Sequence, residues 1–187
     1  MNKFRDKLST RNTAETGVRY EWYALQRCAA TYYREFEKPK IIWGNLATRA
    51  SFTYDEKDHF FINAPACMLP TSSKFILGVL NSNLISYFLK SICAERQGGF
   101  IEQKPVYISQ VPIKKPTLSE EEKIIKLVNK ILLLNKRINE IGDKKTSESA
   151  RIEQEINKND EQIDEIVYNL YGLNKKEIAI IKDSLMK

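Results

Sequence analysis

The chain of 187 residues has few of the side chains that metal sites and active sites use. It has one histidine, His59, and its three cysteines, at positions 28, 67 and 93, form no Cys-x-x-Cys pair, which excludes the common zinc motifs. Seven glycines and six prolines leave no room for a low-complexity linker. No apolar stretch approaches the roughly 20 residues that a membrane-spanning helix needs. The sequence therefore predicts neither a metal site nor a membrane segment.

Catalytic motifs are missing as well. Gly98-Gly99 lies outside the strand–GxGxxG–helix context of a phosphate-binding loop. A base methyltransferase needs an Asn/Asp-Pro-Pro-Tyr/Phe segment, and the nearest stretch, residues 63–66 (NAPA), lacks the second proline and the aromatic residue. Asp55-Glu56-Lys57 has the residue types of a nuclease metal site, but so dense a run of charge is more typical of a solvated turn. We therefore predict no catalytic residues and no cofactor bound by this chain.

What the chain does have is a basic first part. Residues 1–116 contain 17 Lys and Arg against 10 Asp and Glu, a net charge of +7. Residues 117–187 contain 13 against 14, a net charge of −1, so that the whole chain carries +6. This asymmetry indicates that the first part meets a polyanion, although a modest surplus also occurs in proteins that need it only for solubility.

The first part is predicted to be an α/β domain with a mixed or antiparallel sheet over residues 1–116. Runs rich in β-branched and aromatic residues predict strands at 41–43, 51–54 and 59–62, the last two as a hairpin. Thr71, Ser72 or Ser73 is expected to cap the first of two consecutive short helices, which meet at a kink at Asn81-Ser82. Residues 106–108 and 111–113 are expected to be extended.

The second part, residues 117–187, is predicted to be helical. Glu120, Glu121 and Glu122 suit the positive end of a helix dipole and mark a helix start, and Gly142 marks its end. Two heptad stripes, 124-128-131-135-138 and 152-156-159-163-166-170, predict an antiparallel, coiled-coil-like helical hairpin. A capping box opens a final helix over 175–186. The predicted fold class is α+β.

Three segments, taken in order, resemble a known family. They are residues 36–43 (FEKPKIIW), 74–84 (KFILGVLNSNL) and 107–113 (YISQVPI), the last running into the acidic helix start. Together they resemble the C-terminal target-recognition, or specificity, domain of type II, particularly type IIG, restriction–modification adenine-N6 DNA methyltransferases. Type I restriction specificity subunits are similar. The tail at 163–173 (IDEIVYNLYGL) also resembles the end of such proteins, so the resemblance covers about residues 19–183.

The resemblance implies that this chain recognises double-stranded DNA without catalysing a reaction. Its partner is then a methyltransferase or endonuclease domain or subunit, and S-adenosylmethionine and Mg²⁺ are expected only in those associated catalytic domains. The helical hairpin is expected to pack against that partner, and it is also a candidate surface for dimerisation. Whether the chain acts as part of a longer protein or as a separate subunit stays open.

Polar loops supply the candidate DNA contacts, at residues 45–49, 71–74 and 96–104. Arginine suits guanine edges, asparagine and glutamine suit adenine edges, and lysine suits phosphates. The loop at 96–104 ranks first because polar side chains surround the flexible Gly98-Gly99. The predicted DNA-binding residues are Arg27, Lys40, Asn45, Arg49, Thr71, Ser72, Lys74, Arg96, Gln97, Gln103 and Lys104.

Two alternatives stay open. The first is a protein-interaction module that uses the helical hairpin and binds no DNA, which the modest charge surplus allows. The second is an enzyme of an unfamiliar kind built on Asp55-Glu56-Lys57 and His59. A cytoplasmic location is expected, because the first residues lack the apolar core of a signal peptide and the cysteines suit a reducing compartment.

Overall fold

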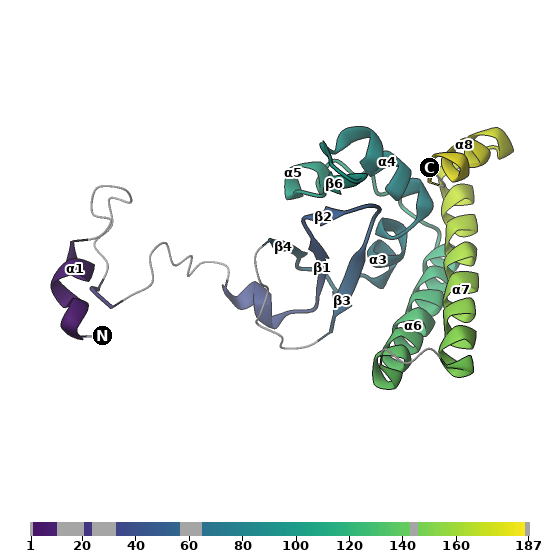
Figure 1. The fold of residues 1–187 in the computed structure, drawn as a ribbon. Coiled ribbons are helices and arrows are strands. Elements are labelled where there is room, and N and C mark those ends of the chain that lie inside the picture. The colour runs from purple at the N-terminus through teal and green to yellow at the C-terminus, as the bar shows by residue number, and fades with distance from the viewer. Residues whose placement is uncertain (1, 11–20, 24–32, 57–64, 143–145, 186–187) are drawn as a thin grey trace.

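The computed structural model describes residues 2–10, 21–23, 33–56, 65–142 and 146–185 (Figure 1). The fold is α+β, as predicted, with two small antiparallel sheets followed by long helices. The strands are β1 (Lys40–Gly44), β2 (Leu46–Ala47), β3 (Phe52–Asp55), β4 (Ala66–Leu69), β5 (Glu95–Arg96) and β6 (Phe100–Glu102). The helices are η1 (Asn2–Phe4), α1 (Arg5–Ser9), η2 (Tyr33–Glu37), α3 (Lys74–Leu80), α4 (Asn83–Ile92), α5 (Pro105–Ile108), α6 (Leu118–Ile141), α7 (Ser147–Tyr171) and α8 (Lys175–Leu185).

The first sheet has the order β3-β1-β4, with β1 antiparallel to both neighbours. The predicted strands at 41–43 and 51–54 are confirmed as β1 and β3, and β4 joins them as the third strand of the sheet. The register sets Trp43 opposite Phe52, and the two buried rings lie 5.5 Å apart. The predicted strand at 59–62 lies outside the described residues.

The second sheet has the order β2-β6-β5 and was not predicted. The loop expected at 96–104 is instead a β-hairpin, whose turn places Gly98 and Gly99 at φ values of 81° and 76°. The prediction that residues 106–108 are extended is wrong. Pro105 at the first helical turn has its φ already set for a helix, and the backbone closes there into the short helix α5.

Helices α3 and α4 meet at the predicted kink. Ser73 caps α3 by accepting a hydrogen bond from the Ile76 amide, and Ser82 caps α4 by accepting one from the Ile85 amide. Between them, the Asn81 side chain acts as a strand partner for β3. Its Oδ1 accepts from the Phe52 amide at 2.9 Å, and its Nδ2 donates to the Phe52 carbonyl at 2.9 Å. The Asn-Ser sequence therefore ties the helices to the sheet.

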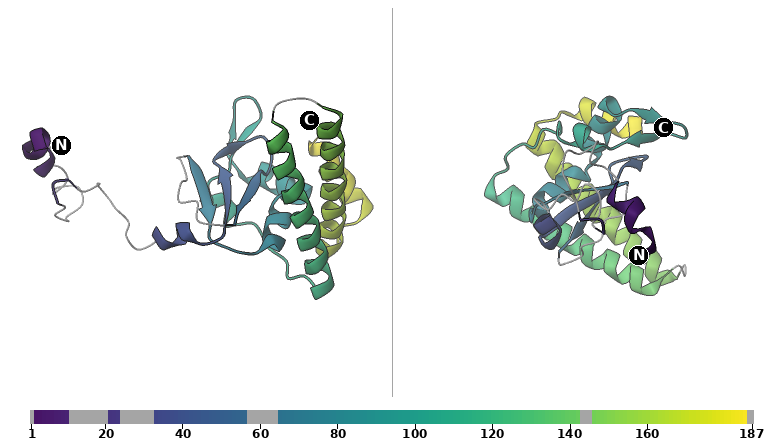
Figure 2. Two further views of the ribbon diagram at one scale, coloured as in Figure 1. Left: turned by 90° about the horizontal axis from the view of Figure 1, so that it is seen from below. Right: turned by 90° about the vertical axis from the view of Figure 1, so that its left-hand side faces the viewer.

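The predicted helical hairpin is confirmed as α6 and α7, which lie side by side in Figure 2. Each helix starts at a capping box, with Thr117 and Glu120 in α6 and with Thr146 and Ser149 in α7. Gly142, at φ 72°, ends α6 as expected. The last helix, α8, starts at the predicted capping box of Asn174 and Glu177.

One hydrophobic core runs through both parts of the chain. It includes Ile41 of β1, Leu77 of α3, Ile124 of α6 and Val167 of α7, all of which are buried. The boundary predicted at residue 116 falls between α5 and α6, but the core continues across it. Among the described residues no single helix is long and apolar enough to cross a membrane, and the bent pair α3–α4 passes such a test by length and composition alone.

Gly78 is the point of closest approach between α3 and the hairpin. A Cβ atom there would lie 2.6 Å from Ile124 Cγ2 and 3.0 Å from Val128 Cγ2. We expect Gly78→Ala to lower the free energy of unfolding by about 1–2 kcal/mol, because the overpacking outweighs the better helix propensity of alanine. Urea unfolding measures the change. In an Ile124→Ala background the same substitution should cost less, and an equal cost in both backgrounds would contradict this explanation.

Candidate nucleic-acid interface

The β2-β6-β5 sheet has one face in the core and one in solvent. Residues that lie directly opposite each other in antiparallel strands share a face, and side chains alternate along a strand. Ile101 of β6 is buried and Ala47 opposite it is half-buried, so this inner face packs on the core at β6 and β2, whereas Glu95, opposite Ile101 on the edge strand β5, is exposed. The other face, called the outer face below, comprises Leu46, Arg96, Phe100, Glu102 and, two residues further on, Lys104.

Two cations surround one carboxylate on the outer face. Arg96 donates from Nε and Nη2 to Glu102 Oε1, at 2.9 and 2.6 Å, and Lys104 Nζ lies 2.5 Å from Glu102 Oε2. Hydrogen bonds from Lys104 and, to a smaller extent, from Arg96 hold the pKa of Glu102 below its usual value. Both cations stay largely exposed, at 56% and 46% of their side chains, and their charge exceeds that of the carboxylate by one. The outer face therefore carries a net charge of +1, with an arginine and a lysine oriented by the same carboxylate.

Gln103 supports this surface from inside, which corrects its predicted role. It is completely buried, because alternation along the strand points it to the same side as Ile101. Its backbone N–H donates to the Asn45 carbonyl at 2.8 Å, and its backbone carbonyl accepts from Trp43 Nε1 at 2.7 Å. Its side-chain Nε2 donates to the Arg49 carbonyl at 2.7 Å. Gln103 thus joins the loop at 45–49 to β6, and its side chain is enclosed within the fold.

Lys40 is the second predicted contact that lies in the interior. Its side chain is completely buried, and Nζ is 2.7 Å from Asp55 Oδ2, opposite it in the register of β1 and β3. The same Nζ donates to the Phe36 and Lys38 carbonyls at 2.7 and 3.1 Å. The expectation that Lys40 binds a phosphate is therefore replaced by a structural role. Asp55, one of the three residues considered for a nuclease site, is the carboxylate of this pair.

The other candidates fall into two groups. Arg96, Gln97 and Lys104 lie on or beside the outer face and are exposed, and Asn45 and exposed Arg49 are linked to it through Gln103. Thr71, Ser72 and Lys74 lie beside the end of β3, where Tyr54 Oη donates to the Ser72 carbonyl, and among the described residues no hydrogen bond or ion pair joins them to the outer face. Arg27 lies outside the described residues.

Lys74 is occupied within the fold. Its Nζ is 2.8 Å from Asn129 Oδ1 of α6 and 3.4 Å from Glu56 Oε1, and it lies 5.3 Å from the centre of the Tyr54 ring. Thr71 is half-buried, with Oγ1 accepting from the Ser73 amide, and Ser72 is exposed. The structure therefore brings the first and third predicted loops together and separates the second from them.

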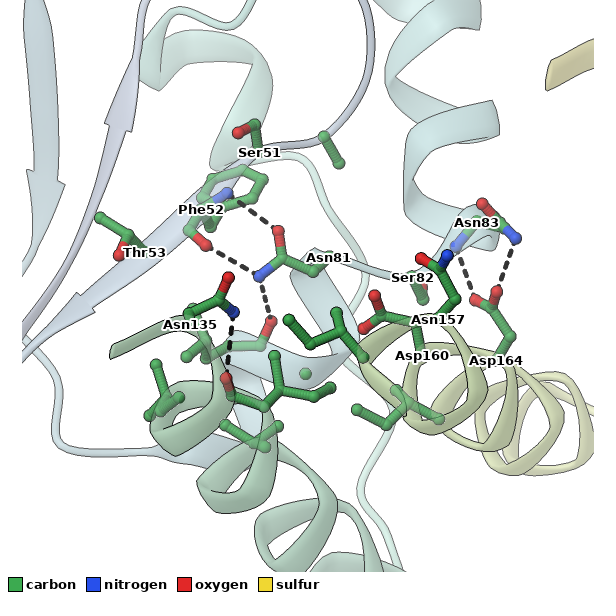
Figure 3. Close-up of a pocket in the computed structure, with 18 of the residues that line it drawn as sticks. Ser51, Phe52, Thr53, Asn81, Ser82, Asn83, Asn135, Asn157, Asp160 and Asp164 are labelled. Carbon is green, nitrogen blue, oxygen red and sulfur yellow. Dashed lines mark hydrogen bonds between the residues drawn. The ribbon is translucent and has the colours of Figure 1, made fainter. Parts of the chain in front are cut away.

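A polar cleft of about 640 Å³ lies between β3, the α3–α4 junction and the hairpin (Figure 3). Asn81 and Asn83 enter it from the junction, and Asn157, Asp160 and Asp164 enter it from α7. Asp164 accepts from the Asn83 amide at 2.7 Å and from Asn83 Nδ2 at 2.5 Å. Its carboxylate therefore caps α4 from another helix and ties the hairpin to the first part of the chain.

Burial raises the pKa of Asp164 to about 6, and the nearby charge of Asp160 adds to this, while the hydrogen bond from Asn83 opposes it. Since the folded pKa exceeds the unfolded value, the folded state binds the proton more tightly. The free energy of unfolding should therefore fall as pH rises from about 4 to about 6. Urea unfolding across this range should show the fall, and Asp164→Asn should flatten it. The exposed neighbour Glu161→Gln is the control, and an unchanged slope in Asp164→Asn would refute the assignment.

No metal centre is found in the described part of the chain, since nowhere in it do three or more His, Cys, Asp or Glu side chains gather around a point that could hold an ion. His59, the histidine considered as a base, lies outside the described residues. Cys67 and Cys93 are free thiols whose pKa values are raised by burial, as for inert cysteines rather than nucleophiles.

Residues 5–113, more than half of the chain, match the family described as the TaqI-like C-terminal specificity domain. The chain belongs to this family. The resemblance seen in the sequence is thereby confirmed, and the matched residues of this specificity domain contain both sheets, both halves of the α3–α4 kink and the whole outer face.

Among solved structures, the specificity domain is similar to the Type IIL restriction-modification enzyme MmeI, which was solved in complex with DNA. The sequence identity is 15% and the TM-score is 0.60, so the two proteins are similar in fold. It covers 98% of this chain but only 25% of MmeI. None of the curated proteins matches the chain.

Sequence analysis missed three residues of the outer face, namely Leu46, Phe100 and Glu102. A signal was present, because residues 100–104 (FIEQK) alternate between side chains that are now seen to point outward and inward. A five-residue alternation next to two glycines is too short to separate a strand from a loop.

Proposed function

We propose that this chain recognises a specific sequence in double-stranded DNA and directs a methyltransferase or endonuclease to it, without catalytic residues of its own. The cationic outer face carries the proposal, because it presents Arg96 and Lys104 on a β-hairpin inside a domain of the specificity family. The major groove of B-DNA admits a two-stranded β-ribbon. The MmeI complex with DNA adds support at the level of the fold.

Affinity and specificity come from different groups in this proposal. Lys104 and Arg49 contact phosphates and release counterions, so that binding weakens steeply with salt. Arg96 and Gln97, at the tip of the β5–β6 hairpin, reach base edges, where arginine pairs with guanine and glutamine with adenine. When DNA arrives, Arg96 and Lys104 exchange Glu102 for groups of the DNA, and the pKa of Glu102, which their hydrogen bonds hold low in the free chain, then rises.

The catalytic functions belong to partners. The chain spans about a quarter of MmeI, so we propose that a methyltransferase or endonuclease domain or subunit completes the enzyme in the cytoplasm. That partner holds S-adenosylmethionine and Mg²⁺. The α6–α7 hairpin docks on it through the side facing away from α3, where Lys123, Lys126 and Lys130 line a groove with Leu127 and Ile166.

Binding of the full chain to a randomised duplex library at two salt concentrations, with sequencing of the enriched DNA, tests the proposal. A short enriched motif whose affinity falls steeply with salt is the expected result. Salt-sensitive binding with no motif would place base readout in the complex with the catalytic partner. If the chain binds no duplex at low salt, the proposal is wrong, and the groove on the hairpin favours the alternative of a protein-interaction module.

A further inference from the structure

Two large apolar side chains stand in solvent among the charges of the outer face. Leu46 is 51% exposed and Phe100 is 43% exposed. The register sets Leu46 opposite Glu102 and Phe100 opposite Arg96, so both lie on the face that carries the cations. A single exposed leucine is ordinary on a protein surface, but this pair is concentrated where two cations are presented.

The Phe100 ring lies next to the hairpin turn. Gly98 has a φ of 81°, and a Cβ atom there would lie 3.5 Å from Phe100 Cδ2 and 3.6 Å from Cε2. The ring therefore lies on the side of the turn to which a Gly98 side chain would point. It is 43% exposed and presents an apolar surface outward beside the turn.

The charged side chains near the Phe100 ring determine which kind of partner can bind over it. On the outer face Arg96 and Lys104 outweigh Glu102 by one positive charge, and the exposed Glu95 lies on the opposite side of β5, so the outer face favours an anionic partner over an apolar protein surface. Within duplex DNA, the major groove presents one apolar group, the 5-methyl group of thymine, and phenylalanine is among the side chains that contact it. Thymine methyl groups therefore match both the charge and the apolar character of this face.

We propose that Phe100, with Leu46 beside it, is a specificity-determining residue that contacts the methyl group of a thymine next to the base read by Arg96. This rests on the proposed DNA recognition and adds an apolar reading element to it. The target then contains a thymine at a fixed place, which hydrogen-bonding side chains alone would not require.

Deoxyuridine tests the proposal, because it keeps the hydrogen-bonding groups of thymine and lacks only the methyl group. Each thymine of the enriched site is replaced in turn, and binding of the full chain is measured. One replacement should weaken binding about three- to fivefold, the value of one buried methyl group. Phe100→Ala should bind both duplexes equally, whereas Phe100→Leu should keep part of the difference.

Val106→Ala is the matched control, since Val106 is an exposed apolar residue on α5 and lies outside the outer face. It should discriminate thymine from uracil as the wild type does. An enriched site without thymine, a wild-type chain indifferent to every replacement, or Phe100→Ala that still discriminates would each overturn the inference while leaving DNA recognition intact. Failure to bind any duplex would instead overturn the proposed function, and this inference with it.

Discussion

Replacing Lys40 by methionine is expected to lower the free energy of unfolding by about 3–5 kcal/mol, a large part of the stability of a domain of this size. Methionine fills much of the space of the lysine stem but leaves the Asp55 carboxylate, only 10% exposed, without its cation. Two backbone carbonyls, of Phe36 and Lys38, lose their donor as well. Denaturant unfolding of the purified chain measures the effect.

A double-mutant cycle separates the ion pair from the rest. Asp55→Asn removes the opposite charge, so Lys40→Met combined with Asp55→Asn should be more stable than Lys40→Met alone. DNA binding by the double variant should keep the salt dependence of the wild type, because Lys40 makes no phosphate contact. A salt dependence weakened by one charge would return Lys40 to the interface, and additive destabilisation would argue that the two side chains are not coupled.

Replacing Arg96 by alanine is expected to weaken binding to the cognate sequence by about 1–3 kcal/mol, roughly fivefold to 150-fold, with little change in non-specific binding. Arg96 is 56% exposed, and its guanidinium is oriented by two hydrogen bonds, from Nε and Nη2, to Oε1 of Glu102, which it exchanges for the base when DNA binds. A planar, oriented guanidinium suits the two acceptors of guanine. Titrations of cognate and scrambled duplexes measure both values.

Arg137→Ala is the matched control for this experiment. Arg137 is an arginine of nearly equal exposure, 55%, that is also paired with glutamates, but it lies on the helical hairpin. It should change neither cognate nor scrambled binding. If Arg96→Ala weakens both duplexes equally, Arg96 contacts a phosphate, and if it changes neither, the outer face is not the DNA surface.

Helix positions were predictable from the sequence because their signals are local. The heptad stripes, the acidic first turn and Gly142 located α6 and α7, and Asn174 with Glu177 located the start of α8. A capping residue accepts a hydrogen bond from an amide two or three positions away, and the apolar residues of a helix face recur every three or four positions. The same locality explains the correct prediction of the kink between α3 and α4 at Asn81-Ser82.

The roles of individual polar residues were not predictable in this way. Lys40 and Lys104 have the same side chain, and each is paired with a carboxylate, yet one is completely buried and the other is 46% exposed. The two glutamines differ in the same way: Gln103 is completely buried, whereas Gln97 is exposed on the turn between β5 and β6. Whether a polar side chain faces the core or the solvent depends on which strands lie beside it.

The sequence by itself determined the α+β class, the helical hairpin, the family and the absence of recognisable catalytic motifs. Only the tertiary structure decided the site, because β2, β5 and β6 are two or three residues long and too short to show a period. They form a sheet only when Leu46 and Ala47 pair with residues 101 and 102, more than fifty positions away. That non-local pairing assigns one face to the core, and so places Phe100 beside Arg96, Glu102 and Lys104 on the other.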